Sequence, residues 1–217
     1  MYLALLYQQW KWARPVIVLG AVAAFAVPLL SVHGAGAGME HKEAAEFLGS
    51  VQLWGVLYPT LAGAIGVLTA IALWTPDHRG RHVYSLALPV ARWRYVLLRY
   101  GAGVALVGIP ILALLLGSVV AALTASLPPG LHAYPIALSV RFALALLVAF
   151  TMFFAVSSGT ARTAAAILGG CAALIVVQIL LSAMGIERNI LLWVINVLLS
   201  SPGPFAVFTG RWMLIDV

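Results

Sequence analysis

The sequence predicts an all-α integral membrane protein with six transmembrane helices and a short N-terminal helix at the membrane surface. Composition is the first reason, because 64% of the residues are hydrophobic, 8% are charged, and the mean hydropathy is +1.07. A water-soluble domain cannot cover so much apolar surface with so few polar groups. Length is the second reason, since 217 residues hold about six runs of the roughly 20 apolar residues that one crossing needs. Residues 1–217 are therefore expected to form a single membrane domain.

The N-terminal segment, residues 1–14, is expected to lie along the bilayer surface as an interfacial helix. Its apolar side chains recur at helical spacing on one stripe: Leu3, Leu6, Tyr7 and Trp10. Its polar side chains lie on other faces: Gln8, Gln9 and Lys11. The alternative is that this segment is only the frayed start of the first span.

Six apolar runs are the predicted spans, at residues 15–33, 50–74, 95–125, 136–158, 163–184 and 189–208. The first follows two basic residues, as the core of a secretory signal would, but we expect it to be retained. The third contains Pro110 and should kink there. The sixth is interrupted by "SSPGPF" at residues 200–205, so its end is either re-entrant or a short span followed by a tail.

Basic residues predict the orientation of these spans. The even-numbered connections and both termini carry nine Lys or Arg residues: Lys11, Arg14, Arg79, Arg81, Arg92, Arg94, Arg99, Arg162 and Arg211. The odd-numbered connections carry three: Lys42, Arg141 and Arg188. Because cytoplasmic loops are enriched in basic residues, both termini are expected in the cytoplasm of a multi-pass protein of the inner (plasma) membrane. This bias accounts for the net charge of +6, so no nucleic-acid partner is needed.

Two predicted spans carry small residues four apart, which allow helices to approach closely. One stripe is Ala62, Gly66 and Ala70, and the other is Ala165, Gly169 and Ala173. Packing within one subunit is favoured over a dedicated dimer seam.

The spans lack the chemistry of several functional classes. No ionisable residue lies at mid-membrane depth, which disfavours proton or sodium coupling. Arg141 is about one turn into its span and can extend outward, while Gln178 and Asn196 are neutral. No phosphate-binding G-x-x-x-x-G-K-[ST] loop occurs, so any ATP and Mg²⁺ would be bound by another polypeptide.

Enzymatic and metal-binding roles are also disfavoured. All five histidines fall in connections or at span ends, where they cannot serve a nucleophile inside the membrane: His33, His41, His78, His82 and His132. His78 and His82 would share a helical face beside Asp77, but two histidines and one carboxylate are a weak metal signal. We expect no catalytic residue, no metal site and no cofactor held by this chain.

Charge is dense only in residues 75–94, "TPDHRGRHVYSLALPVARWR", between the second and third spans. Pro76 and Pro89 bound a short amphipathic run, "VYSLALPV". Apolar residues surrounded by charges are typical of a helix that docks in a partner's groove. The residues expected to contact that partner are Asp77, His78, Arg79, Gly80, Arg81, His82, Pro89 and Arg92.

This segment resembles the cytoplasmic loop of type-2 ABC transporter permeases. That loop places a glycine after an acidic turn and then Pro-Val-Ser-Arg, and Gly80, Pro89, Val90, Ala91 and Arg92 stand at the matching positions. Arg81 replaces the family's threonine, and Ala91 its serine. The resemblance implies that residues 75–94 hold the coupling helix, residues 1–14 the connecting helix, and that this chain is an exporter permease.

The same resemblance implies partners and leaves alternatives open. A second permease copy or homologue and an ABC ATP-binding subunit would complete the transporter. A narrower resemblance, to the permease linked to haem export in cytochrome c maturation, rests on Pro89, Arg99, Gly108 and Pro110. A membrane assembly or scaffold subunit without transport is the remaining alternative.

Overall fold

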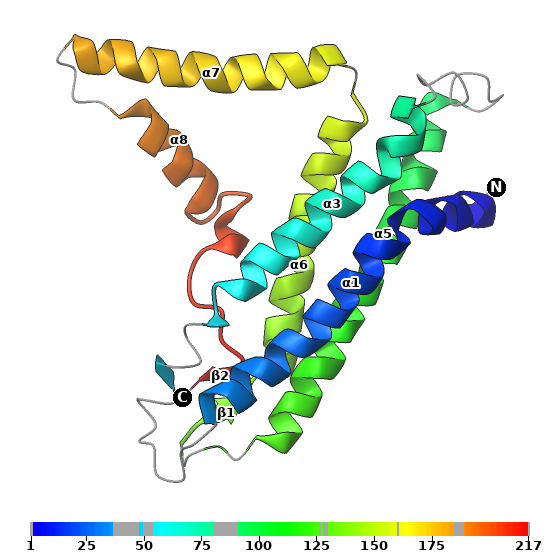
Figure 1. The fold of residues 1–217 in the computed structure, drawn as a ribbon. Coiled ribbons are helices and arrows are strands. Elements are labelled where there is room, and N and C mark those ends of the chain that lie inside the picture. The colour runs from blue at the N-terminus through cyan, green and yellow to red at the C-terminus, as the bar shows by residue number, and fades with distance from the viewer. Residues whose placement is uncertain are drawn as a thin grey trace. The chain divides into compact units, whose positions relative to one another are not determined.

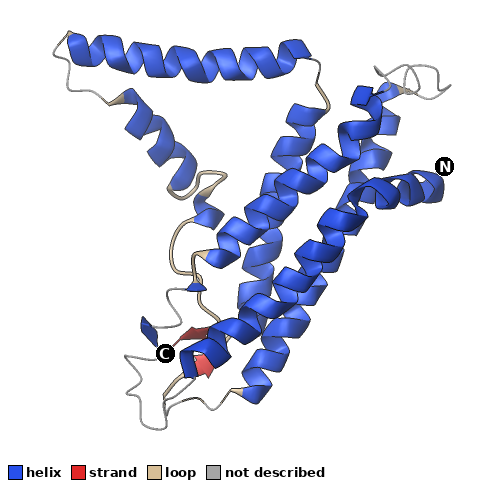
Figure 2. Cartoon of the chain, in the orientation of Figure 1, coloured by secondary structure: helices blue, strands red, loops and turns tan. Residues whose placement is uncertain are grey.

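A computed structural model describes residues 2–36, 48–49, 54–79, 91–125, 127, 130–159, 161–184 and 189–216. Figure 2 shows that these residues are almost all helical, with two short strands beside the C-terminus. The helices are α1 (Tyr2–Gly36), α3 (Leu57–Arg79), α5 (Arg92–Thr124), α6 (Pro135–Ser157), α7 (Ala161–Ala183), α8 (Ile190–Leu199) and a 3-10 turn, η1 (Ala206–Phe208). The strands are β1 (His132–Ala133) and β2 (Ile215–Asp216).

Four helices are long and apolar enough to cross a membrane: Tyr2–Gly34, Leu57–His78, Trp93–Thr124 and Pro135–Ser157. This confirms the all-α class and indicates a multi-pass membrane protein. The remaining apolar helical stretches within the described chain are shorter, at Ala172–Ala183 and Ile190–Leu199. Four of the six expected spans are thus present as membrane-length helices.

The chain divides into two compact units. The first holds the chain up to Phe154 together with the residues from Arg211 onward, and the second is Ala155–Gly210. Within the first unit α1 packs most extensively along α5 and next along α3 (Figure 1). The second unit contains α7, α8 and η1.

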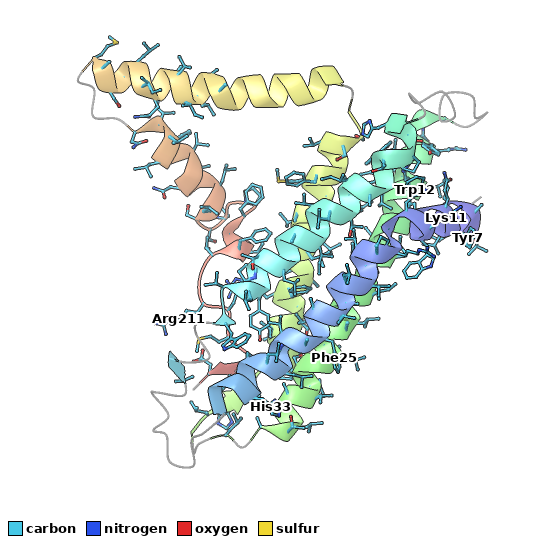
Figure 3. All side chains as sticks on the ribbon, viewed as in Figure 1. Tyr7, Lys11, Trp12, Phe25, His33 and Arg211 are labelled. Carbon is cyan, nitrogen blue, oxygen red and sulfur yellow. The ribbon has the colours of Figure 1, made fainter. Side chains whose placement is uncertain are left out.

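Helix α1 is continuous across the expected boundary at residue 14. It has 35 residues and is about 52 Å long at 1.5 Å per residue, which exceeds the roughly 30 Å hydrocarbon core. Pro15 lies inside it, and Figure 3 shows the segment with Tyr7, Lys11 and Trp12 turned away from the axis that carries Phe25 and His33. Leu3 and Tyr7 are 76% and 73% exposed, so this segment turns apolar side chains outward as an interfacial helix would.

Small residues bring the helices of the first unit together. Ala62, Gly66 and Ala70 are all buried, and a Cβ at Gly66 would lie 2.8 Å from the Phe150 backbone nitrogen of α6. This confirms packing within one subunit for the first predicted stripe. In the second stripe, Gly169 and Ala173 are exposed, and a Cβ at Gly169 would meet nothing within 4 Å. Within the described part of the chain, intrasubunit packing of that stripe is not found.

The last expected span, residues 189–208, is not one helix. Helix α8 has ten residues and ends at Leu199, directly before the "SSPGPF" segment. Its start is capped twice, because Asn189 accepts a hydrogen bond from the Leu192 N–H and Gln178 of α7 accepts one from the Ile190 N–H at 2.8 Å. At 1.5 Å per residue, α8 is about 15 Å long, half the hydrocarbon core.

The two termini lie at opposite ends of the first unit. Near the N-terminus, the Gln9 side chain contacts Arg99, close to the start of α5. Near the C-terminus, β2 pairs antiparallel with β1, which lies between the end of α5 and the start of α6. Figure 3 shows Arg211 well separated from Tyr7 and Lys11. Backbone pairing thus holds residues 215–216 at the far end of α5 from Gln9, and the expected cytoplasmic placement of both termini stays a prediction.

Gly117 gives a direct test of the α1–α5 contact. A Cβ there would overlap the Phe25 carbonyl oxygen, which is fixed in the backbone of α1. We expect Gly117→Ala to lower the free energy of unfolding by about 1–3 kcal/mol, measured by thermal unfolding in detergent. Gly108→Ala in the same helix is the control, because a Cβ there meets nothing within 4 Å and alanine favours helix. Equal effects of the two substitutions would contradict this packing.

Candidate functional site

A buried ion pair joins α3 to α5 beside the predicted docking segment. Asp77 lies in the last turn of α3, and Arg99 lies in the second turn of α5. Arg99 Nη1 donates to Asp77 Oδ2, and Nη2 donates to the Leu73 carbonyl oxygen. The two residues are 3% and 7% exposed, Arg99 being the more buried. The pair therefore ties together the two helix ends between which residues 80–91 run.

Aromatic side chains enclose the guanidinium. Its Cζ lies 4.4 Å from the centroid of the Trp74 ring and 5.7 Å from that of Tyr95. The Tyr95 hydroxyl accepts a hydrogen bond of 2.6 Å from Arg99 Nη1. Cation–π contacts strengthen when the cation is removed from water, and a guanidinium stacks on flat rings better than an ammonium does. These contacts offset part of the cost of burying the charge.

The N-terminal helix reaches the same pair. Gln9 is 4% exposed, and its Nε2 donates to the Arg99 carbonyl oxygen at 3.0 Å. Leu5 and Ala13, one turn before and after it, are also buried. The face of residues 2–14 that packs on the protein is thus the Leu5, Gln9 and Ala13 face, opposite to the exposed Leu3 and Tyr7.

A ring cluster extends the site to α6. The Trp74 and Phe154 centroids are 5.2 Å apart, and those of Tyr100 and Phe150 are 5.7 Å apart with nearly parallel rings. The Tyr100 hydroxyl lies 2.8 Å from Thr151 Oγ1. Aromatic pairs at these separations each contribute about 0.5–1.5 kcal/mol beyond the area they bury. The ion pair and this cluster together connect α1, α3, α5 and α6 at one end of the bundle.

The predicted docking residues are distributed around this site. Asp77 is buried in the ion pair, whereas His78 beside it is exposed. Arg79 ends α3 and Arg92 begins α5, but neither side chain is among those described. Gly80, Arg81, His82 and Pro89 lie outside the described residues, so their docking role stays a prediction. Among the described residues, no group of three or more histidine, cysteine or carboxylate side chains could hold a metal ion.

Sequence reasoning did not identify the Asp77–Arg99 pair, because both residues were counted as cytoplasmic charges. A signal was present. Asp77 is the only acidic residue between Glu46 and Glu187, and Arg99 stands within an otherwise apolar run after Trp93. A lone carboxylate and an arginine inside neighbouring spans are expected to pair, because each alone is costly in the membrane. The indication that Gln9 is buried was weaker, because Gln9 is a single amide on a helix predicted to lie at the membrane surface.

Breaking the pair tests how strongly it holds this end together. We expect Arg99→Met to lower the free energy of unfolding by about 3–5 kcal/mol, because Asp77 is left buried and unpaired. Arg94→Met in the same helix is the matched control, since Arg94 is exposed and the expected change is about 0.5 kcal/mol or less.

The double variant Asp77→Leu with Arg99→Met separates charge from packing. It is expected to recover most of the lost stability, because no unpaired charge remains. Thermal unfolding in one detergent compares all three variants. A double variant less stable than Arg99→Met alone would show that the unpaired carboxylate is not the cause of the loss.

Protein-family models, curated proteins and solved structures gave no match to this chain.

Proposed function

We propose that this chain is the membrane permease subunit of an ATP-driven exporter, with ATP hydrolysed by a separate ABC-type subunit. The partner docks on residues 75–94, and the translocation path forms between this permease and a second copy or homologue. The permease itself carries no catalytic residue in this proposal. ATP and Mg²⁺ belong to the partner.

The observation that carries the proposal is the locked pair of helix ends around the docking segment. Residues 80–91 connect the end of α3, two residues after Asp77, to the start of α5, seven residues before Arg99, and the side chains of Asp77 and Arg99 form a buried ion pair. If the two helix ends were not joined, a displacement imposed by the partner would move the loop alone. Because the ion pair joins α3 and α5, a displacement of residues 80–91 would move both helices together. Gln9 and the ring cluster would transmit it to α1 and α6.

Orientation follows from the charges at this end. Lys11, Arg14 and Arg94 are exposed there, and Arg79, Arg81 and Arg92 belong to the same end by sequence. The positive-inside rule places this end in the cytoplasm, where an ATP-binding subunit would be. In this proposal the chain is an inner (plasma) membrane permease with a cytoplasmic N-terminus, as expected from the sequence. The sixth span expected at residues 189–208 is not part of the proposal.

Energy coupling by ions is the competing reading of a buried charge in a membrane helix. The position of the pair argues against it. Asp77 is two residues from the end of α3 and Arg99 is seven residues into α5, so the pair lies near the cytoplasmic ends rather than at mid-membrane depth. The Asp77 carboxylate is also occupied, because it accepts a hydrogen bond from Arg99. The pair is better suited to joining helices than to carrying protons.

The walls of the four membrane-length helices suit an apolar or amphipathic substrate. Asp77 and Arg99 are the only buried charged residues in the described part of the chain, and they satisfy each other. A hydrophilic substrate would require further polar groups along the path.

Reversing charge in the docking segment tests partner binding. The chain is purified from its native membrane, and bound ATP-binding polypeptides are labelled with a photoreactive ATP analogue. We expect the unaltered chain to retain a labelled polypeptide and Arg79→Glu with Arg81→Glu to lose at least 80% of it, because about two favourable surface contacts become repulsive.

Arg211→Glu is the control for that experiment, since Arg211 is an exposed arginine at the other end of the first unit. It should retain the labelled polypeptide in full. Equal insertion of all three chains into the membrane is checked by alkaline extraction. Full retention by the double variant, or no labelled polypeptide with the unaltered chain, would contradict the docking role.

Transport is distinguished from a scaffold role by ATPase activity. In liposomes that hold the chain with its ATP-binding subunit, we expect an amphipathic cation or a lysophospholipid to raise the ATPase rate at least twofold. A neutral sugar of similar mass should not change it. An ATPase rate that is insensitive to all three solutes would support a membrane assembly subunit instead.

A further inference from the structure

The last residues of the chain form a folded element against the α5–α6 connection. Ile215 and Asp216 pair antiparallel with Ala133 and His132, and the Tyr134 N–H donates to the Leu214 carbonyl oxygen at 2.8 Å. We call residues 211–216 the C-terminal strap. Gly210, directly before the strap, has φ of +84°, a backbone conformation that glycine adopts without strain.

Side chains hold the strap as firmly as the backbone does. Trp212, Leu214 and Ile215 are buried, as are Leu131 and Leu138 at the start of α6. Arg141 of α6 donates to the Arg211 carbonyl oxygen at 2.5 Å, and its Cζ lies 4.6 Å from the centroid of the Trp212 ring. A loose tail would keep its backbone groups and large apolar side chains in water. The strap is therefore part of the first unit.

The strap fixes where the chain must return after α6. Helix α6 starts at Pro135, two residues after β1, and its 23 residues extend about 34 Å to Ser157. The chain thus leaves the first unit at the cytoplasmic end, beside Phe154, and re-enters it at the opposite end, at Arg211. The intervening residues 155–210 have to traverse the membrane a net odd number of times.

Helix lengths decide how this is done. With 23 residues, α7 reaches the roughly 20 that one crossing requires, and its apolar stretch within the described residues is Ala172–Ala183. With ten residues, α8 is half that length and cannot return the chain to the cytoplasmic face. We propose that residues 1–217 cross the membrane five times and that the strap holds residues 211–216 on the outer face, opposite to the N-terminal segment.

This proposal does not depend on the ATP-driven function. It rests on the contacts of the strap and on the lengths of α6, α7 and α8. The basic residues place the N-terminal end inside. With Arg211 outside, eight of the nine residues first counted as cytoplasmic remain so, namely Lys11, Arg14, Arg79, Arg81, Arg92, Arg94, Arg99 and Arg162. The positive-inside bias is retained.

Cysteine labelling tests the sidedness. Cys171 is the only cysteine, so Cys171→Ser gives a background in which Gln8→Cys or Asp216→Cys is the single thiol, and both positions are exposed. With a membrane-impermeant maleimide on intact cells, we expect Asp216→Cys to be labelled at least tenfold more than Gln8→Cys. Both should label equally after permeabilisation. Labelling of both thiols from the same side would overturn the proposal.

A disulfide tests the strap itself in the same background. Because Tyr134 donates to Leu214, Ala133 and Ile215 are a non-hydrogen-bonded pair, for which Cα atoms are about 4.5 Å apart. That separation permits a disulfide. We expect Ala133→Cys with Ile215→Cys to lose both free thiols on mild oxidation and regain them on reduction.

The control pair is Ala133→Cys with Gln8→Cys, which joins opposite ends of the first unit and should keep both thiols free. Thiols are counted by the gel shift of a polyethylene-glycol maleimide. Free thiols in the strap pair after oxidation, with the chain inserted and purified as a single species, would show that residues 211–216 do not pair with β1 and would remove the basis for five crossings.

Discussion

The Asp77–Arg99 ion pair is the interaction on which the packing at this end of the helix bundle depends. A guanidinium and a carboxylate this deeply buried have lost most of their hydration, so each is tolerated only because the other is present. That mutual requirement holds α3 and α5 in one register. The Leu73 carbonyl and the Trp74 and Tyr95 rings then fit around the guanidinium. Gln9 of α1 donates to the Arg99 backbone carbonyl oxygen, so three helices meet at this residue. The ion pair joins the two helices that flank the proposed docking segment, so movement of that segment would be passed to both helices.

Much of the fold follows from the sequence by simple physics. Runs of apolar residues of bilayer length predicted α1, α3, α5 and α6, although α1 begins at Tyr2 rather than at residue 15 and α3 begins at Leu57 rather than at residue 50. The Ala62, Gly66 and Ala70 stripe was predicted to pack within the subunit and does so against α6. Hydropathy was less informative at α8, because it averages over the helix-ending "SSPGPF" segment and so merged a ten-residue helix with the turn that follows it.

The parts that sequence reasoning missed are contacts between distant residues. Charge counting cannot detect that Leu214 and Ile215 pair with a connection some 80 residues earlier. It also treated Asp77 and Arg99 as two independent surface charges, although 22 residues and a helical reversal bring them together.

Helix α1 carries a consequence of its own. It runs unbroken for 35 residues, is held to α5 near one end by Gln9 and near the other by the contact of Phe25 with Gly117, and leaves Leu3 and Tyr7 to the lipid. Its first turns are therefore placed where a change in bilayer thickness or headgroup packing would tilt them. Pro15 lies between these turns and Phe25, so such a tilt would act first on the contact of Gln9 with the Arg99 carbonyl oxygen, which would make lipid composition an input to the ion-pair end of the bundle.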